Sequence, residues 1–302
     1  ITPGLLSLHQ IIVDDHVRNG DYSSALQELN AALDLQPDNI NLYKLKLSLL
    51  GQLGDNNGIE RLLFDMVARF PDDAASRNTL VRWLVSRGEL DKAEQLLRAD
   101  IDPGSDDPTN HLVLVQFLSE MRGKQVAIEE LDRVMASEKA GPMFQALRAG
   151  LVFDSGDHEQ AIEEMEMALG AATGQDAGNI SVGLARMLIA TGNAVGARAL
   201  IEKTLETDST NVDALKLKAN WLIDDDRVGE AIVALRSALD QDPRDAGIMS
   251  LMARAYERDG NQELVGEMLS LAVQTSNNAP IESMRYAQYL TGRDRHSAAE
   301  EI

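Results

Sequence analysis

Small or apolar residues recur along the chain at a fixed spacing, and this spacing is the strongest pattern in the sequence. The step is 34 residues everywhere except between Ala161 and Ala197, where it is 36. A period of this length indicates one unit of supersecondary structure that stacks on copies of itself. The nine positions are Ala25, Ile59, Ala93, Ala127, Ala161, Ala197, Ala231, Val265 and Ala299.

Between these positions the apolar residues follow a helical period. Leu80 and Leu84 in one unit, and Leu184 and Leu188 in another, are four residues apart and so share one face of an α-helix. The sequence predicts an all-α fold of helix-turn-helix units, with eight full repeats and a truncated ninth. The expected repeats are 6–39, 40–73, 74–107, 108–141, 142–177, 178–211, 212–245, 246–279 and 280–302.

Glycine and proline mark the expected ends of these helices. The glycines lie where the turn inside a unit needs a left-handed or sterically free residue, and the prolines lie where the second helix must end. The glycines are Gly54, Gly88, Gly156, Gly192 and Gly260, and the prolines are Pro37, Pro71 and Pro243.

Alanine at the recurrent position allows close approach of neighbouring helices, and a longer side chain there would overpack by about 1–3 kcal/mol. Ile59 and Val265 depart from alanine, so we expect slightly wider junctions at these two positions.

The first unit, from Asn19 to Asn39, closely resembles the tetratricopeptide (TPR) repeat, and the resemblance extends over essentially the whole chain. It implies a right-handed α-solenoid, a single superhelix over residues 1–302, whose first helices line a concave groove. The large aromatic residue that the family has near the start of the first helix is mostly replaced here, with only Tyr43 aromatic. This departure weakens individual repeats and leaves the turn, alanine and proline positions in agreement with the family.

The single long step between repeats falls on residues 170–178. Gly170, Gly174 and Gly178 soften this connection, which makes it the expected hinge of the solenoid. The alternative is a longer loop without consequence, because insertions in such loops cost little free energy.

Composition narrows the choice of partner. The chain has 49 acidic and 28 basic residues and a net charge of -21, which disfavours nucleic acid and anionic lipid surfaces. It has no cysteine, so disulfides and thiolate sites are excluded. No stretch reaches the roughly 18 apolar residues that a membrane span requires.

The ends of the sequence suggest a piece of a longer protein. The chain starts at Ile1 and stops at Ile302, inside the second helix expected for the ninth unit. Its long, acidic, alanine-rich array also resembles exported bacterial TPR proteins. This resemblance favours an exported location, periplasmic or membrane-anchored, over a cytoplasmic one.

No constellation of catalytic residues is visible in the sequence. The five histidines (His9, His16, His111, His158 and His296) lack metalloprotease spacing and a recurring acidic neighbour. The acidic runs at 100–107 and 224–226 offer the oxygen atoms that Ca²⁺ prefers, but a solvated loop and a turn are the favoured interpretations. We therefore predict no catalytic residue, no metal site and no cofactor.

The resemblance places the ligand-binding surface on the first helices, in two rows. The first row is Lys44, Asn78, Leu112, Ala146, Val182, Lys216 and Ser250, and the second is Ser48, Arg82, Gln116, Gly150, Arg186, Asn220 and Arg254. In the middle units the expected groove is apolar, through Leu112, Met143, Phe153, Val182 and Ile189. The alternative for these apolar residues is burial against a neighbouring first helix after an error of register.

Toward the carboxyl end the expected groove gains positive charge and amide donors, through Lys216, Asn220, Arg254 and Arg285. Lys216 and Asn220 match the first-repeat lysine and asparagine of carboxylate-clamp TPR domains, and Arg285 matches the arginine two repeats later. Two other clamp residues are replaced, by Leu251 and Ile281, which puts a heat-shock-type C-terminal peptide in doubt. The alternative is simple charge balance against Asp213, Asp224 and Glu257.

Three functions remain open at this point. The leading hypothesis is a non-catalytic scaffold that binds a protein or peptide segment in the groove. The second is a structural span of a larger cell-envelope or secretion assembly, with possible self-association through the terminal repeats. The third is a frame for an enzyme domain outside these residues.

Overall fold

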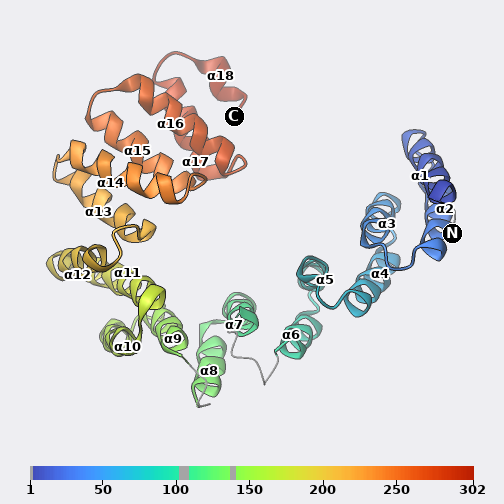
Figure 1. Cartoon of the computed structure of the whole chain (residues 1–302), viewed down its shortest axis with the longest axis horizontal. Coiled ribbons are helices and arrows are strands. Elements are labelled where there is room, and N and C mark those ends of the chain that lie inside the picture. Colours follow the sequence, from blue (N-terminus) through green and yellow to red (C-terminus); the bar gives the residue numbers. More distant parts are fainter. Residues whose placement is uncertain (1–2, 102–108, 137–140) are drawn as a thin grey trace. The chain divides into compact units, whose positions relative to one another are not determined.

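The structure is a computed structural model that describes residues 3–101, 109–136 and 141–302. Over these ranges every regular element is an α-helix, and 18 helices follow one another in chain order (Figure 1). The fold class predicted from the sequence is confirmed. The chain divides into two compact units, residues 1–123 and 124–302, and each unit is described by itself.

The first unit contains three helix pairs and a further helix. Within each pair the two helices pack together, and the second helix of a pair packs on the first helix of the next. The helices are α1 (Pro3–Arg18), α2 (Tyr22–Leu35), α3 (Ile40–Leu53), α4 (Asn56–Arg69), α5 (Ala74–Ser86), α6 (Leu90–Ala99) and α7 (Thr109–Met121).

The second unit begins with one helix and continues with five pairs. The helices are α8 (Lys124–Met135), α9 (Pro142–Asp154), α10 (His158–Ala171), α11 (Gly174–Ala190), α12 (Ala194–Thr207), α13 (Val212–Asp224), α14 (Val228–Gln241), α15 (Ala246–Arg258), α16 (Gln262–Thr275), α17 (Pro280–Thr291) and α18 (His296–Glu300). The odd-numbered helices also contact each other directly, α9 with α11, α11 with α13 and α13 with α15. These odd-numbered helices therefore form one layer of the unit.

The turns inside the pairs use left-handed backbone, as the glycine positions predict. All five predicted turn glycines have positive φ, between 66° at Gly54 and 102° at Gly156. Two aspartates take the same conformation at equivalent positions, Asp226 with φ of 62° and Asp294 with φ of 59°. Aspartate is one of the few non-glycine residues that visits this region of φ/ψ space, which explains how these turns form without glycine.

Short polar side chains start many of the helices. Asp55 accepts a hydrogen bond from the backbone N–H of Gly58 at 2.8 Å, and Asn193 accepts one from Gly196 at 2.9 Å. Each bond satisfies a backbone donor that the first helical turn leaves free. The same cap occurs at Asp21, Asn39, Asp73, Asp157, Asn211, Asp245 and Asn261.

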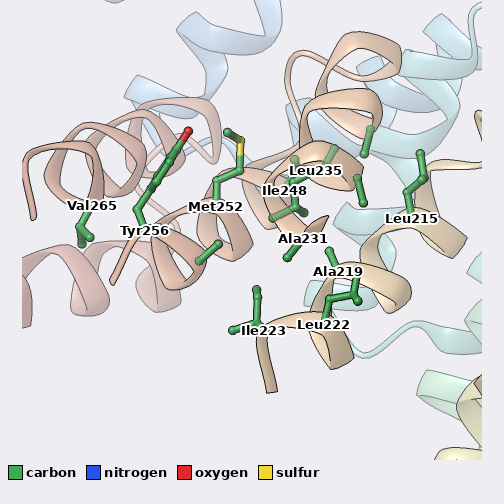
Figure 2. Packing of buried hydrophobic residues seen from close by; sticks show 14 of the residues in the cluster. Leu215, Ala219, Leu222, Ile223, Ala231, Leu235, Ile248, Met252, Tyr256 and Val265 are labelled. Carbon is green, nitrogen blue, oxygen red and sulfur yellow. The ribbon is translucent and has the colours of Figure 1, made fainter. Parts of the chain in front are cut away.

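The recurrent residues lie at the contacts between helices. Ala161, Ala197 and Ala231 are 0% exposed, and Val265 is 4% exposed. Figure 2 shows Ala231 and Val265 within the largest cluster of the second unit, where Leu222, Ile248 and Tyr256 also lie, on helices α13 to α16. The period of the sequence is thus the period of close helix contact.

The segment 170–178 is mostly helical, which differs from the soft connection expected from its glycines. Helix α10 continues to Ala171, and α11 starts at Gly174 and is 17 residues long. The two extra residues of this repeat are absorbed by a longer helix. The division between the two units lies at Gly123 and Lys124, outside this segment.

We expect Ala197→Leu to destabilise the second unit by about 1–3 kcal/mol, because its larger side chain has no room at the fully buried contact. Ala199→Leu is the matched control, since Ala199 lies exposed on the same helix and a change there costs less than about 0.5 kcal/mol. Urea unfolding followed by circular dichroism measures both. Equal losses for the two variants would contradict the role assigned to the recurrent alanine.

Candidate functional site

Three of the four second-unit residues in the first expected groove row are buried. Ala146, Val182 and Ser250 are 7%, 2% and 7% exposed. Val182 packs with Ala185, Ala197, Ile201 and Ala214, a cluster formed by α11, α12 and α13. The prediction that Val182 lines an apolar groove is wrong, because this face of α11 is covered by its neighbours.

The other apolar residues expected in the groove differ in exposure. Ile189 on α11 is 44% exposed. Met143 and Phe153 on α9 are half-buried, and the Phe153 ring stacks on the ring of His158 with centroids 4.3 Å apart. Leu112, also half-buried, belongs to α7 of the first unit. The expected apolar groove therefore stays a prediction for Leu112, Met143, Phe153 and Ile189.

Charged residues on α11, α13 and α15 pair with each other across the odd-numbered layer. Arg186 Nη2 lies 3.1 Å from Asp213 Oδ1, and Lys216 Nζ lies 2.7 Å from Asp245 Oδ2 and 3.7 Å from Asp213 Oδ1. Positive and negative side chains thus alternate along one row, which we call the acid–base row (Arg186, Asp213, Lys216, Asp245). Lys216 is consequently engaged within the protein.

Arg254 makes a second set of contacts between α13 and α15. Its Nη1 donates to Asn220 Oδ1 at 2.6 Å, and its Nη2 pairs with Asp224. Two of the three residues that match a carboxylate clamp, Lys216 and Asn220, therefore bind neighbouring side chains. The charge balance considered as the alternative accounts for Lys216 with Asp213 and for Arg254 with Asp224.

The aspartates of the acidic run 224–226 pair with arginine side chains. Asp225 accepts two hydrogen bonds from Arg198, at 2.7 and 3.0 Å, and Asp226 lies 3.9 Å from Arg258. Of the other acidic run, Asp100 pairs with Arg77, whereas residues 102–108 lie outside the described residues. Where the structure describes the chain, no three His, Cys, Asp or Glu side chains gather as metal ligands.

The environment of Asp245 affects its pKa in two directions. Burial raises the pKa, whereas hydrogen bonds from Lys216 and from the backbone of Ile248, together with the charge of Lys216, lower it more strongly. The net pKa of Asp245 lies below its ordinary value. Asp245 therefore stays ionised at neutral pH, and its contact with Lys216 links α13 to the start of α15.

A basic pocket opens between α15 and α17, with α16 as its floor. Its volume is about 520 Å³, and three arginines and one glutamate line it: Arg254, Arg285, Arg293 and Glu257. Arg285 has no hydrogen-bond or ion-pair partner within the described residues. A local excess of positive charge thus occurs in a chain whose net charge is -21.

The pocket lies beyond the last close contact within the odd-numbered layer. Helices α9, α11, α13 and α15 contact each other in sequence, and the recurrent residues on the helices between them are Ala161, Ala197 and Ala231. Helices α15 and α17 do not make a comparable contact. The recurrent residue at that junction is Val265, which lines the pocket floor. The wider junctions expected at Ile59 and Val265 stay a prediction.

The wall on α17 is fixed by a tyrosine. Tyr289 Oη donates to the backbone carbonyl of Gln262 at 2.7 Å. A Cβ at position 266 would lie only 2.7 Å from Tyr289 Oη, so the absence of a side chain at Gly266 makes this contact possible. Arg293 lies over the Tyr289 ring, 5.1 Å from its centroid, and donates to Gln262 Oε1 at 3.0 Å. These contacts orient the Arg293 guanidinium at the pocket rim.

Of the site residues expected from the sequence, the structure brings Arg254 and Arg285 together in one pocket. It places Arg186, Lys216 and Asn220 in contacts between odd-numbered helices, outside that pocket. Sequence reasoning missed Arg293, Gln288 and Tyr289. The spacing of Arg285, Gln288 and Tyr289 along one face of α17 was a signal that could have identified part of this wall.

Comparison with known proteins identifies the class to which the fold belongs. Residues 152–220 match the tetratricopeptide repeat family. The human IFIT1 dimer with PPP-AAAA matches 97% of this chain and 74% of its own chain at 14% sequence identity, with a TM-score of 0.53. The Cut9–Hcn1 hetero-tetramer of the APC/C matches 89% of this chain at 14% identity, with a TM-score of 0.51.

The chain has the fold of a tetratricopeptide-repeat protein, and residues 152–220 carry the sequence of that repeat. It spans 52% of the matched chain in the Cut9–Hcn1 structure. No curated protein sequence matches it. None of the described helices has the length and apolar character needed to cross a membrane.

We expect Val182→Asp to destabilise the second unit by about 3 kcal/mol or more, because it places an unpaired carboxylate in a buried apolar cluster. Ile189→Asp on the same helix is the control and should cost less than about 1 kcal/mol, since Ile189 is 44% exposed. Thermal melting followed by circular dichroism compares them. A folded Val182→Asp chain of unchanged stability would restore the original groove assignment.

The lowered pKa of Asp245 predicts an acid-dependent contribution to stability. A carboxyl whose pKa is lower in the folded state stabilises the fold above its unfolded pKa, and this contribution disappears as pH falls through the folded pKa, below the ordinary value of 3.8. Asp245→Asn keeps the helix cap and removes the charge. Urea unfolding should therefore show wild type more stable at pH 7, and this difference should vanish as the pH falls well below 3.8.

Asp240→Asn, at an exposed position on α14, is the control for this comparison. A gap between wild type and Asp245→Asn that is independent of pH would show that the charge of Asp245 contributes nothing.

Proposed function

We propose that this protein is a non-catalytic scaffold that binds a protein segment carrying carboxylates, and that the basic pocket between α15 and α17 receives the acidic residues. The observation that carries the proposal is the convergence of Arg254, Arg285 and Arg293 on one cavity of about 520 Å³ in a strongly acidic chain.

The three arginines differ in how firmly they are held. Arg254 is fixed by Asn220 and Asp224, and Arg293 by Tyr289 and Gln262, whereas Arg285 has no such partner where the structure describes the chain. A guanidinium presents a planar fork that binds a carboxylate through two parallel hydrogen bonds. Two pre-positioned arginines and one uncommitted arginine suit recognition of more than one carboxylate.

Proteins built from tetratricopeptide repeats generally act as protein–protein interaction scaffolds, which supports a protein ligand. The amide side chains of Gln262 and Gln288 line the same pocket and can bond the ligand backbone. Ordering an extended segment offsets much of the contact energy, so we expect modest affinity.

The finer predictions about origin and assembly remain proposals. Export from a bacterial cell, and a role as a structural span of an envelope assembly, rest on the resemblance of the whole array to exported TPR proteins. Reading the gene upstream of Ile1 for an export or lipid-anchor signal tests the first of these.

We expect Arg285→Ala to weaken binding of a fluorescently labelled hexaglutamate peptide about tenfold, which corresponds to about 1.4 kcal/mol, because one charge-assisted hydrogen-bonding group is lost. Fluorescence anisotropy at low ionic strength measures the affinity. The net charge of -21 repels this peptide in general, so its binding requires a local basic site.

Arg295→Ala is the matched control, because Arg295 is exposed and does not line the pocket. Hexaglutamine, which lacks the charges, should bind more weakly than hexaglutamate. Absence of hexaglutamate binding, or equal binding by wild type and Arg285→Ala, would refute the proposed site.

A further inference from the structure

A second groove lies on α12, α13 and α14 and shares no lining residue with the basic pocket. Its volume is about 570 Å³, and its floor and walls are largely apolar, with Leu205 on α12, Leu222 on α13 and Ala234 on α14. Val233 on α14 lines it and is 67% exposed, although a valine gains free energy when it is buried.

The groove runs along the helices. On α14 its lining residues include positions 229, 233 and 237, which follow one face of the helix over about two turns, a length of roughly 10 Å. On α12 they include positions 202, 205 and 206, and Ser209 in the turn after α12 also lines the groove. Helices α12 and α14 each pack on α13 and not on each other, so a channel parallel to the helix axes remains between them.

The next repeat shows why the channel is open here. One period of 34 residues further on, Leu215 is replaced by Met249, Leu222 by Tyr256, Gly229 by Glu263 and Ser237 by Leu271. Tyr256 is 6% exposed and is larger than the leucine at the equivalent position, whereas methionine and leucine are similar in size. The smaller residues Leu222, Gly229 and Ser237 therefore help to keep the groove between α12 and α14 open.

The rim of the groove is acidic. Glu202, Glu206 and Glu230 line it against the single cation Lys218. Lys218 Nζ binds Glu202 at 2.8 Å. Glu230 binds Arg227, which does not itself line the groove. Glu206 has no hydrogen-bond or ion-pair partner among the residues that the structure describes, so a negative charge on the α12 side is left uncompensated.

We propose that this groove binds a short amphipathic α-helix of a partner protein, with an apolar stripe facing α13 and lysine or arginine on its flanks. A helix laid along a channel between two helices packs its side-chain ridges into their grooves, and apolar anchors at spacings of three, four and seven residues would reach the floor. The acidic rim complements basic flanks and repels acidic ones.

The groove and the basic pocket therefore select opposite ligand charges. The proposed helix site stands independently of the function assigned to the basic pocket, because it uses different helices and different residues.

The test is selection of a phage-displayed library of 12-residue helical peptides, with all positions randomised, on the full wild-type chain. We expect enriched peptides to carry apolar residues at positions i, i+3 or i+4, and i+7, flanked by lysine or arginine. A labelled enriched peptide should bind the Val233→Asp variant at least tenfold more weakly than wild type, as measured by fluorescence anisotropy. Its affinity for the Glu206→Lys variant should also be lower than for wild type.

Val195→Asp is the matched control and should leave affinity unchanged, because Val195 is an exposed valine of α12 outside the groove. Both changed valines are more than 60% exposed, and circular dichroism melting checks that each variant folds. Failure to enrich any peptide, enrichment of acidic flanks, or equal binding by wild type and Val233→Asp would overturn the proposal. Loss of self-association in Val233→Asp would assign the groove to a second copy and would also overturn it.

Discussion

The close approach of helices at the recurrent small residues is the constraint on which the second unit depends. At Ala161, Ala197 and Ala231 the side chain is a single methyl group and is 0% exposed, so neighbouring helix backbones come near each other. In this unit α9, α11, α13 and α15 also contact each other directly. Side chains 27 to 34 residues apart in sequence can then meet, as Arg186 and Asp213, Lys216 and Asp245, and Arg254 and Asn220 do.

The same constraint decides which charged residues remain available to a ligand. Where the odd-numbered helices touch, Lys216 and Asn220 are taken up by neighbouring side chains, although their sequence positions match residues that grip a carboxylate in clamp domains. Helices α15 and α17 are not in close contact, and Arg285, which has no side-chain partner among the described residues, lies in the pocket between them. Binding capacity thus follows the packing of the layer.

The sequence alone predicted the helices, the turns and the fully buried alanines, because each rests on a local or strictly periodic requirement. It did not determine which face of a first helix is covered. Successive helical residues differ by about 100° around the axis, so a small error of register turns an exposed row into a buried one, as happened for Val182. Ion pairs such as Lys216–Asp245 depend on the spacing between helices, which one sequence does not state.

Part of the candidate site was therefore predictable and part was not. Arg254 and Arg285 follow from the repeat period, whereas Arg293 lies beyond the end of α17 in the turn before α18, where no helical spacing applies. Its place at the rim is set by Tyr289, and Tyr289 in turn depends on the absence of a Cβ at Gly266. Such a chain of contacts becomes visible only when α16 and α17 are packed together.

The distribution of charge explains how one acidic chain can present two surfaces of opposite preference. A net charge of -21 repels polyanions from a distance, so an acidic segment gains from the basic pocket only after it reaches the converging guanidiniums at short range. The proposed basic helix would be attracted by the whole molecule and would bind where apolar surface is also open, between α12 and α14. Long-range attraction would therefore raise the association rate at the groove, whereas short-range geometry would set the specificity of the basic pocket.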